Sequence, residues 1–239
     1  MTDIKIIYED TSLLVINKPA GLLIHTTTSK RANTEETLVN WLVSKYPDIR
    51  KVGENALRPG IVHRLDKDTS GVMVIAKNQE TFEYLKSQFQ NGLIAKTYRA
   101  LIFGSPKNDT GVIEGVISLK PGTTKHTVHK GKMPKPAVTE YRVLERFENV
   151  SFIEVYPKTG RTHQVRVHLA SIYHPVLGDK LYGSKTSKKL FIPKLNRQML
   201  HAYKIEFESH NGKKLMLTAD QPEDFEAVLQ YFRKTPKLQ

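Results

Sequence analysis

One stretch of the chain sets a carboxylate among basic side chains. It covers residues 58–71, and an uninterrupted apolar run follows at residues 72–76. Asp66 stands two positions after Arg64, and a carboxylate next to a cation stays ionised and fixed in place, as a nucleophile requires. If the segment is extended, both side chains project to the same side, because side chains alternate along a strand. The stretch therefore predicts a reactive carboxylate beside a cation on one surface.

Two other segments place polar side chains inside expected secondary structure. Tyr98 stands between two cations in a strand expected at residues 95–103, and Arg166 lies in a helix expected at residues 162–173. Taken alone, Tyr98 is typical of a half-buried strand residue, and Arg166 is typical of a surface arginine on an amphipathic helix. Their residue types alone therefore do not assign them to a site.

The charge of the chain points to a polyanion as partner. Lys and Arg number 37 against 24 Asp and Glu, which gives a formal net charge of +13. The excess is clustered, since residues 119–135 and 184–197 contain several cations and no acid. Such acid-free loops suit phosphate contacts better than a mixed, solubilising surface does. Lys125, Lys130 and Lys132 in the first stretch are therefore candidate phosphate ligands.

Several common chemistries lack their sequence signatures. There is no Gly-x-Gly-x-x-Gly loop, no Gly-x-x-x-x-Gly-Lys-Ser/Thr loop and no Gly-x-Ser-x-Gly elbow. His126 and His129 stand in a lysine-rich stretch without an acidic partner, and His163 and His168 have no third ligand nearby in the sequence. We therefore expect neither a metal nor an organic cofactor.

The composition also bears on the compartment. Cysteine is absent, and the longest uninterrupted apolar runs are four or five residues. Disulfides and thiolate metal sites are thereby excluded, and no run is long enough for a transmembrane helix. The N-terminal residues lack the apolar core of a signal peptide. We therefore expect a cytoplasmic protein that does not contact a membrane.

Short strands alternate with a few amphipathic helices. We expect three hairpins, at residues 4–17, 139–156 and 202–218. Two helices are expected to begin at the N-caps Asn33 and Asn78, the first with a capping box. The pattern predicts an α+β fold with a mainly antiparallel sheet flanked by helices and loops, in a single domain of residues 1–239. Because no exposed apolar stripe is evident, we expect a monomer.

Motifs along nearly the whole chain resemble those of the RluA-type pseudouridine synthase family. The run His63-Arg64-Leu65-Asp66 is similar to the signature of that family, in which the Asp is catalytic. The other similar segments follow in the same order and spacing, at residues 17–21, 96–100, 160–168 and 174–179. The resemblance implies the pseudouridine synthase catalytic fold and the isomerisation of uridine in structured RNA without a cofactor. It favours ribosomal large-subunit RNA over tRNA.

The resemblance also implies the catalytic residues. Asp66 is the catalytic carboxylate, which either attacks the nucleoside or abstracts a sugar proton. A desolvated carboxyl drifts toward its neutral form, so it needs a nearby cation, and by resemblance Arg166 supplies this ion pair. Tyr98 stacks on the target base and takes part in proton transfer.

The same resemblance implies how RNA is held. Arg64 enters the RNA and stabilises the flipped nucleotide, and His63 is grouped with it as an RNA-binding residue. Arg161 and His163 stand at the start of their expected helix, where backbone N–H groups face an anion. Many members of the family carry an N-terminal S4 RNA-binding domain, which we expect to be missing here, so affinity must come from the catalytic domain and its basic stretches.

Two other readings stay open. The run Asp66-Lys67-Asp68-Thr69 resembles the Asp-x-Asp-x-Thr signature of haloacid-dehalogenase-type phosphatases, but His63 and Arg64 interrupt the apolar strand that precedes such motifs. The second reading is a non-catalytic RNA-binding or ribosome-assembly protein. It would use the basic stretches and would have no need of a pair between Asp66 and Arg166.

Overall fold

The computed structural model describes residues 4–25, 36–123, 125–129, 131–184, 192–193 and 195–235. The chain forms two compact units, each made of two separate segments. Unit 1 consists of Met1–Ala95 and Ala202–Asp220, and unit 2 consists of Lys96–His201 and Gln221–Gln239. Whether both act as the single catalytic domain expected for residues 1–239 stays a prediction.

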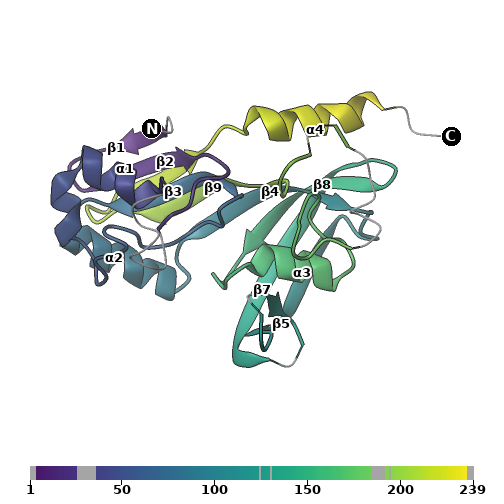
Figure 1. Ribbon diagram of the computed structural model, residues 1–239, viewed down its shortest axis with the longest axis horizontal. Coiled ribbons are helices and arrows are strands. Elements are labelled where there is room, and N and C mark those ends of the chain that lie inside the picture. Colours follow the sequence, from purple (N-terminus) through teal and green to yellow (C-terminus); the bar gives the residue numbers. More distant parts are fainter. Residues whose placement is uncertain are drawn as a thin grey trace. The chain divides into compact units, whose positions relative to one another are not determined.

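Unit 1 is a sheet with two helices (Figure 1). Its strands follow the order β1–β2–β3–β9, with β10 paired to β9, and the pairs β1–β2, β2–β3 and β9–β10 are antiparallel. The strands are β1 (Lys5–Glu9), β2 (Leu13–Lys18), β3 (Ser70–Ala76), β9 (Leu200–Glu208) and β10 (Lys214–Thr218). The helices are α1 (Leu38–Lys45) and α2 (Gln79–Gln90), with a 3-10 turn at Pro47–Lys51. The first and third predicted hairpins are confirmed.

Local sequence signals explain the helices of unit 1. Asn78 caps α2 as expected, and its side-chain oxygen accepts the Thr81 N–H at 2.9 Å. The predicted start of α1 is wrong, because the structure begins this helix at Leu38 and the side chain of Thr37 caps it. Asn33, the expected cap, lies outside the described residues.

Unit 2 contains antiparallel strands in the order β4–β8–β7–β5–β6. Its strands are β4 (Ala95–Phe103), β5 (Thr110–Leu119), β6 (His126–Thr127), β7 (Lys132–Arg146) and β8 (Val150–Pro157). Its helices are α3 (Gln164–Ser171) and α4 (Glu223–Lys234). Helix α3 packs on β5, β7 and β8 (Figure 1).

Two apolar clusters hold unit 2 together. Val165 and Leu169 of α3 are buried against strand residues that include Ala100 and Ile153. A separate cluster joins Phe225 of α4 to residues of β4 and β8 and to the segment before β9. Burial of large apolar side chains of this kind contributes roughly 1.5 to 3 kcal/mol each.

The strands at the basic stretch differ from the expectation of a loop. We predicted the hairpin of β7 and β8 to begin at Thr139, whereas β7 begins at Lys132 and pairs with β5, a strand that was not predicted. Pro134 and Pro136 hide the strand in the sequence, because proline removes a ladder donor and is confined to special positions in a sheet. The basic stretch 119–135 is therefore a hairpin, which we call the basic hairpin.

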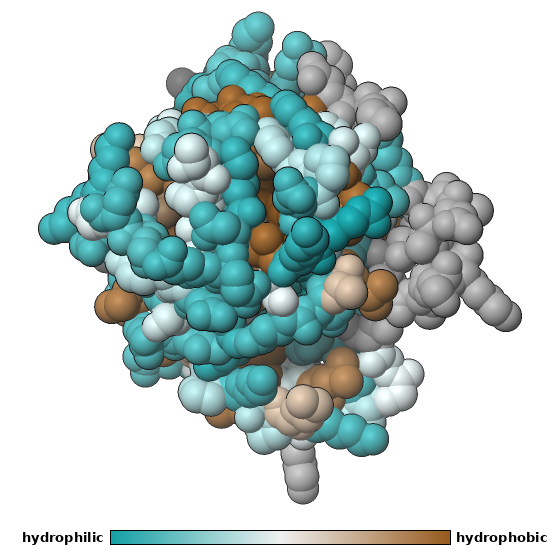
Figure 2. Space-filling view, turned by 90° about the vertical axis from the view of Figure 1, so that its left-hand side faces the viewer, coloured by the Kyte–Doolittle hydropathy of each residue, from teal (hydrophilic) through white to brown (hydrophobic). Residues whose placement is uncertain are grey.

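The predicted fold class, α+β with a mainly antiparallel sheet, is confirmed by the strand pairing. Among the described residues, no helix is long and apolar enough to cross a membrane. The face on the side of α1 and α2 is mostly hydrophilic, and apolar side chains show through it only in small groups (Figure 2).

Candidate active site

Asp66 lies on an irregular segment that leads into β3. The segment is a turn, because the Asp66 carbonyl accepts the Thr69 N–H at 3.1 Å, and the Asp66 side chain is half-buried. The turn covers residues 66–69, so the alignment of Arg64 and Asp66 by alternation in an extended segment stays a prediction. The turn directly precedes β3, a strand whose seven residues are all buried.

A buried lysine fixes the backbone next to Asp66. Lys18, at the end of β2, is 0% exposed, and its ammonium donates to the carbonyls of Pro19 at 2.7 Å, Leu22 at 3.0 Å and Lys67 at 3.0 Å. The Lys67 carbonyl also accepts the Gly21 N–H at 2.9 Å. A buried charge needs this degree of hydrogen bonding, so the turn that carries Asp66 is tied to the end of β2.

His63 and Arg64 differ in their surroundings. The ring of His63 stacks on Phe89 with centroids 4.7 Å apart, and its Nε2 accepts the Val74 N–H at 2.9 Å. Arg64 is exposed. Burial first, and then the charges of Arg64 and Arg58, lower the pKa of His25. The contacts of His63 therefore stabilise unit 1. The effect on His25 shows that Arg58 and Arg64 place positive charge near its ring.

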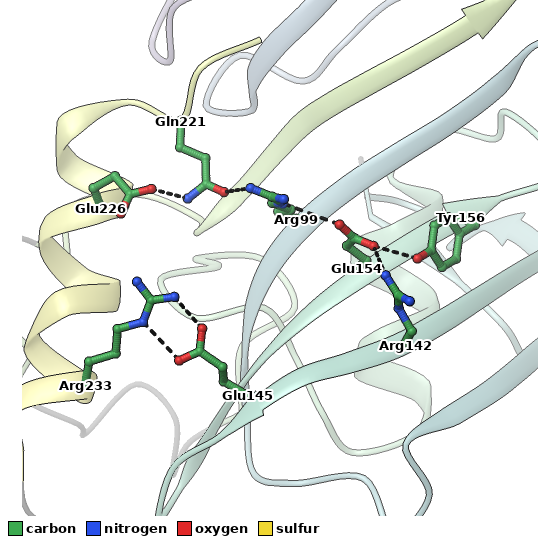
Figure 3. A network of polar contacts seen from close by, with 8 residues as sticks. All are labelled: Arg99, Arg142, Glu145, Glu154, Tyr156, Gln221, Glu226 and Arg233. Carbon is green, nitrogen blue, oxygen red and sulfur yellow. Dashed lines mark hydrogen bonds and ion pairs between the residues drawn. The ribbon is translucent and has the colours of Figure 1, made fainter. Parts of the chain in front are cut away.

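Tyr98 lies on β4 opposite Val155 of β8 and packs half-buried against the cluster under α3. The next residue, Arg99, points to the other face of the sheet, because side chains alternate along a strand. There its guanidinium lies 3.5 Å from Glu154 and donates to Gln221 at 2.7 Å (Figure 3).

The contacts of Glu154 extend this network across three strands (Figure 3). Its carboxylate accepts from Arg142 at 2.9 Å and from the Tyr156 hydroxyl at 2.7 Å. Burial favours the neutral acid, but the Tyr156 hydroxyl and the two arginines outweigh it, so the pKa of Glu154 lies below its ordinary value. Burial and then Glu154 raise the pKa of Tyr156 to about 12. Because Gln221 also donates to Glu226 at 2.6 Å, the network fixes β4, and with it the backbone of Tyr98, to α4.

Arg166 is buried in α3, contrary to the surface position that its helix alone suggests. It is 5% exposed, and its Nε and Nη2 donate to the two carboxylate oxygens of Asp179 at 2.7 and 2.9 Å. Burial alone raises the pKa of Asp179, but Arg166 and the backbone N–H groups of Tyr182 and Leu181 outweigh it, so the pKa lies below its ordinary value. Two of the three guanidinium nitrogens are thus fixed within unit 2.

The start of α3 is also basic. His163 is the N-cap and has a left-handed backbone with φ 56°, and the helix begins at Gln164 rather than at the expected Thr162. Arg161 donates from its backbone N–H to Gln164 Oε1 at 2.9 Å and from Nε to the Pro136 carbonyl at 3.0 Å. Burial and then the charge of Arg161 lower the pKa of Lys96. This end of the helix therefore combines cations with backbone N–H groups that favour an anion.

The basic hairpin exposes part of its charge. Lys125 and Lys132 are both exposed, as phosphate contacts require, whereas Lys130 lies outside the described residues. The second acid-free stretch, residues 184–197, is described only in part.

The structure divides the predicted site residues between the units. Unit 1 holds His63, Arg64 and Asp66. Unit 2 holds Tyr98, Arg161, His163, Arg166, Lys125 and Lys132. It brings Arg161, His163 and Arg166 to the first turns of α3, while the pair of Asp66 and Arg166 joins different units and stays a prediction.

Sequence reasoning missed Lys18 and Asp179. Both stand in segments that resemble family motifs, but the sequence does not show that their side chains are buried or what they bind. No group of three metal-ligating side chains occurs among the described residues, and the expectation of a reaction without metal or cofactor stays a prediction.

The chain is similar to proteins of one known family. A family model described as RNA pseudouridylate synthase matches residues 12–171. The chain is 39% identical to a Nitrosomonas europaea protein named ribosomal large subunit pseudouridine synthase D, over 98% of this chain and 66% of that protein. It is 42% identical to a protein of Aquifex aeolicus named as an uncharacterized RNA pseudouridine synthase, over 97% of this chain and 73% of that protein.

A solved structure has the same fold. Human RNA pseudouridylate synthase domain containing 4 matches 96% of this chain and 93% of its own with a TM-score of 0.74 and 27% identity. The chain thus spans about two thirds to three quarters of the length of the two curated relatives above. The chain belongs to the RNA pseudouridylate synthase family, a family of isomerases, as its motifs predicted.

Proposed function

We propose that this chain converts specific uridines of structured RNA to pseudouridine, and that its substrate is ribosomal large-subunit RNA. The observation that carries the proposal is the half-buried Asp66 on a turn tied down by the buried ammonium of Lys18, inside the part of the chain that matches the family. Four similar bacterial proteins are named ribosomal large subunit pseudouridine synthase D. Their name supports the choice of RNA.

Asp66 is the catalytic carboxylate in this proposal. The bond between C1′ and N1 of the uridine breaks, a bond between C1′ and C5 forms, N1 gains a proton and C5 loses one. The reaction is redox neutral, so no nicotinamide or flavin is needed. Asp66 either attacks the nucleoside or abstracts a sugar proton. Arg166 is the cation that keeps Asp66 ionised, and Tyr98 stacks on the base and takes part in proton transfer.

RNA is held by positive charge in both units. Extrusion of the target base from its stack costs roughly a few kcal/mol. We assign Arg64, which is exposed, to the flipped state, with His63 beside it. The phosphate contacts belong to Arg161 and His163 at the start of α3 and to the basic hairpin through Lys125, Lys130 and Lys132. The enzyme works as a monomer in the cytoplasm.

Pseudouridine mapping on total RNA tests the function. Cells lacking the gene are complemented with the wild type, with Asp66→Asn or with Asp68→Asn as a matched control two residues away. Sites restored by the wild type and by Asp68→Asn, but not by Asp66→Asn, establish the activity and name the RNA.

The opposite result supports a different function. The net charge of +13 also suits an RNA-binding or ribosome-assembly protein without catalysis. If no site changes, or if Asp66→Asn restores the sites fully, this second function replaces the first.

A further inference from the structure

We propose that Asp179 and Tyr182 are positioning residues that clamp Arg166, and that the Tyr182 hydroxyl links this clamp to the basic hairpin. The proposal rests on the proposed function, in which Arg166 serves the reaction and the basic hairpin holds RNA. Every contact that carries it lies within unit 2.

The first part of the clamp is the carboxylate of Asp179, which binds one edge of the Arg166 guanidinium. Asp179 is 2% exposed and binds two nitrogens of Arg166. The same carboxylate oxygen that accepts from Nη2 also accepts the N–H groups of Leu181 at 2.8 Å and Tyr182 at 3.0 Å. A bidentate pair fixes the plane of a guanidinium as well as its place. Asp179 therefore orients Arg166 and at the same time folds the turn that carries Tyr182.

The second part of the clamp is the tyrosine ring. The guanidinium carbon of Arg166 lies 5.1 Å from the centroid of the Tyr182 ring, within the range of a cation–π contact. Tyr182 also packs, together with Val128 of the basic hairpin, against the cluster of Ile117, Ala137 and Val167. Arg166 is thus held at one edge by a carboxylate and covered by a ring that is itself held by packing.

The Tyr182 hydroxyl makes the link to the hairpin. It accepts the backbone N–H of His126, in β6, at 2.9 Å and lies 2.8 Å from His163 Nδ1. The rings of His126 and His163 meet edge to face, with centroids 5.5 Å apart. One oxygen atom therefore joins the basic hairpin, the N-cap of α3 and the turn that clamps Arg166, three residues further along the helix.

This arrangement predicts a division of effects between kcat and KM. A displacement of a polar group by about 1 Å can cost roughly 100-fold in rate. Asp179→Asn removes the charge that orients Arg166, and we expect kcat to fall by roughly 10- to 100-fold. Tyr182→Leu removes the ring, and we expect kcat to fall by roughly tenfold.

Tyr182→Phe keeps the ring and removes only the oxygen that binds the hairpin. We expect KM for RNA to rise by roughly threefold to tenfold, as the loss of one or two hydrogen bonds implies, with kcat close to that of the wild type. Tyr173→Phe is the matched control, because Tyr173 is 87% exposed. It should match the wild type in both constants.

A readout independent of activity separates this proposal from the proposed function. The Nε–H resonance of Arg166, assigned through Arg166→Lys, is recorded by NMR in the whole protein. We expect slow exchange with solvent in the wild type, fast exchange in Asp179→Asn and a changed chemical shift in Tyr182→Leu, where the ring current is lost.

Each result decides something. If the wild type makes no pseudouridine while the resonance behaves as expected, the clamp stands and the proposed function fails. If the resonance and kcat of Tyr182→Leu equal those of the wild type, the clamp is overturned. An unchanged KM in Tyr182→Phe overturns the link to the hairpin. Should Asp179→Asn not fold, the two Tyr182 variants still carry the test.

Discussion

The ammonium of Lys18 links two separate parts of the chain, because it donates hydrogen bonds to backbone carbonyl oxygens of both. One of these parts is the turn that follows Asp66. Its three carbonyl partners lie at residues 19, 22 and 67, and the side chain is completely buried. Each hydrogen bond to a charged group is worth more than a neutral one. The turn that carries the proposed catalytic residue is therefore held by one side chain.

Lys18→Met tests this role. The change leaves three carbonyls without their donor, and a buried unsatisfied group costs roughly 1 kcal/mol or more. We expect the free energy of unfolding, measured with urea, to fall by about 3 kcal/mol. The control is Lys51→Met, an exposed lysine, which should change stability by less than about 0.5 kcal/mol. Equal stability of the two variants contradicts the role given to Lys18.

The sequence alone could nominate candidate site residues but could not predict the partners of their side chains. Asp66 and Arg166 stand in motifs that resemble those of a family, so their candidacy needs no coordinates. The pairing of Arg166 with Asp179, which is 13 residues away along the chain, depends on a turn after α3 that no local signal describes. The turn that follows Asp66 was missed for a similar reason, since Lys18 binds it from another strand.

Among the elements, β3 and β9 approach each other so closely that one position needs glycine. Gly71 has φ +122°, and a Cβ built on it would lie 2.2 Å from the Ala202 carbonyl oxygen. Gly212, in the turn between β9 and β10, also has a positive φ of +78°, but a Cβ there would meet nothing within 4 Å. A side chain at Gly212 would therefore cause backbone strain alone, whereas a side chain at Gly71 would cause both backbone strain and a steric clash.

Alanine at each position should show this difference in thermal unfolding. Gly212→Ala carries backbone strain alone and should cost about 1 to 2 kcal/mol. Gly71→Ala adds a clash with backbone that can only be relieved by moving β3 from β9, and we expect a further loss of about 3 kcal/mol. A melting temperature for Gly71→Ala that equals that of Gly212→Ala would show that the strands can separate without cost.

Helix α4 is anchored by an ion pair at its first turn. Arg197 donates from Nε and Nη2 to the two oxygens of Asp224 at 2.6 and 2.8 Å. Burial alone raises the pKa of Asp224, but Arg197 and backbone N–H groups outweigh it, so the pKa lies below the ordinary 3.8. A lowered pKa in the folded state means that the pair stabilises the protein above pH 3.8 and that this contribution is lost as the pH falls toward the folded pKa.

The pH dependence follows for a variant without that carboxylate. Asp224→Asn should be less stable than the wild type at neutral pH, and the difference should shrink as the pH falls below about 4. Urea unfolding between pH 3 and pH 7 measures it. The control is Asp48→Asn, at an exposed position. A difference between wild type and Asp224→Asn that stays constant with pH would contradict the role of the ion pair.

Elements that the sequence marks locally, by a helix cap, by helical spacing of apolar residues or by a turn dipeptide, could be predicted. Elements without such marks could not. Helix α2 has its cap at Asn78 and its apolar positions at helical spacing, and the hairpin of β9 and β10 has Asn211-Gly212, so both were found. Strand β5 contains Gly111 and Gly115, and the start of β7 contains two prolines, so their strand character comes from pairing across the sheet.

At the scale of the whole molecule, we expect the net charge of +13 to dominate the affinity for RNA. Binding should weaken with salt, because each neutralised phosphate releases counterions. Lys125→Gln combined with Lys132→Gln should lower the slope of log K against log salt by about 2, one for each lost phosphate contact. Lys213→Gln combined with Lys214→Gln, which removes the same two charges at exposed lysines outside the basic hairpin, is the control.

The measurement is fluorescence anisotropy of a labelled RNA titrated at several salt concentrations. A slope that is equal in the double variant and in the wild type removes the basic hairpin from the RNA interface. A slope that falls equally in the double variant of Lys213 and Lys214 shows that net charge alone matters.

The two-segment make-up of each unit has a consequence for biosynthesis. Unit 1 is built from residues 1–95 and 202–220, so it lacks β9 and β10 until the intervening residues 96–201 have been synthesised. Domains that are contiguous in sequence can fold one after another during translation. Here neither unit has that opportunity, so we expect the nascent chain to keep the apolar β2 and β3 incompletely covered until β9 and β10 have emerged. The need for protection by chaperones should therefore last until residue 220 has left the ribosome.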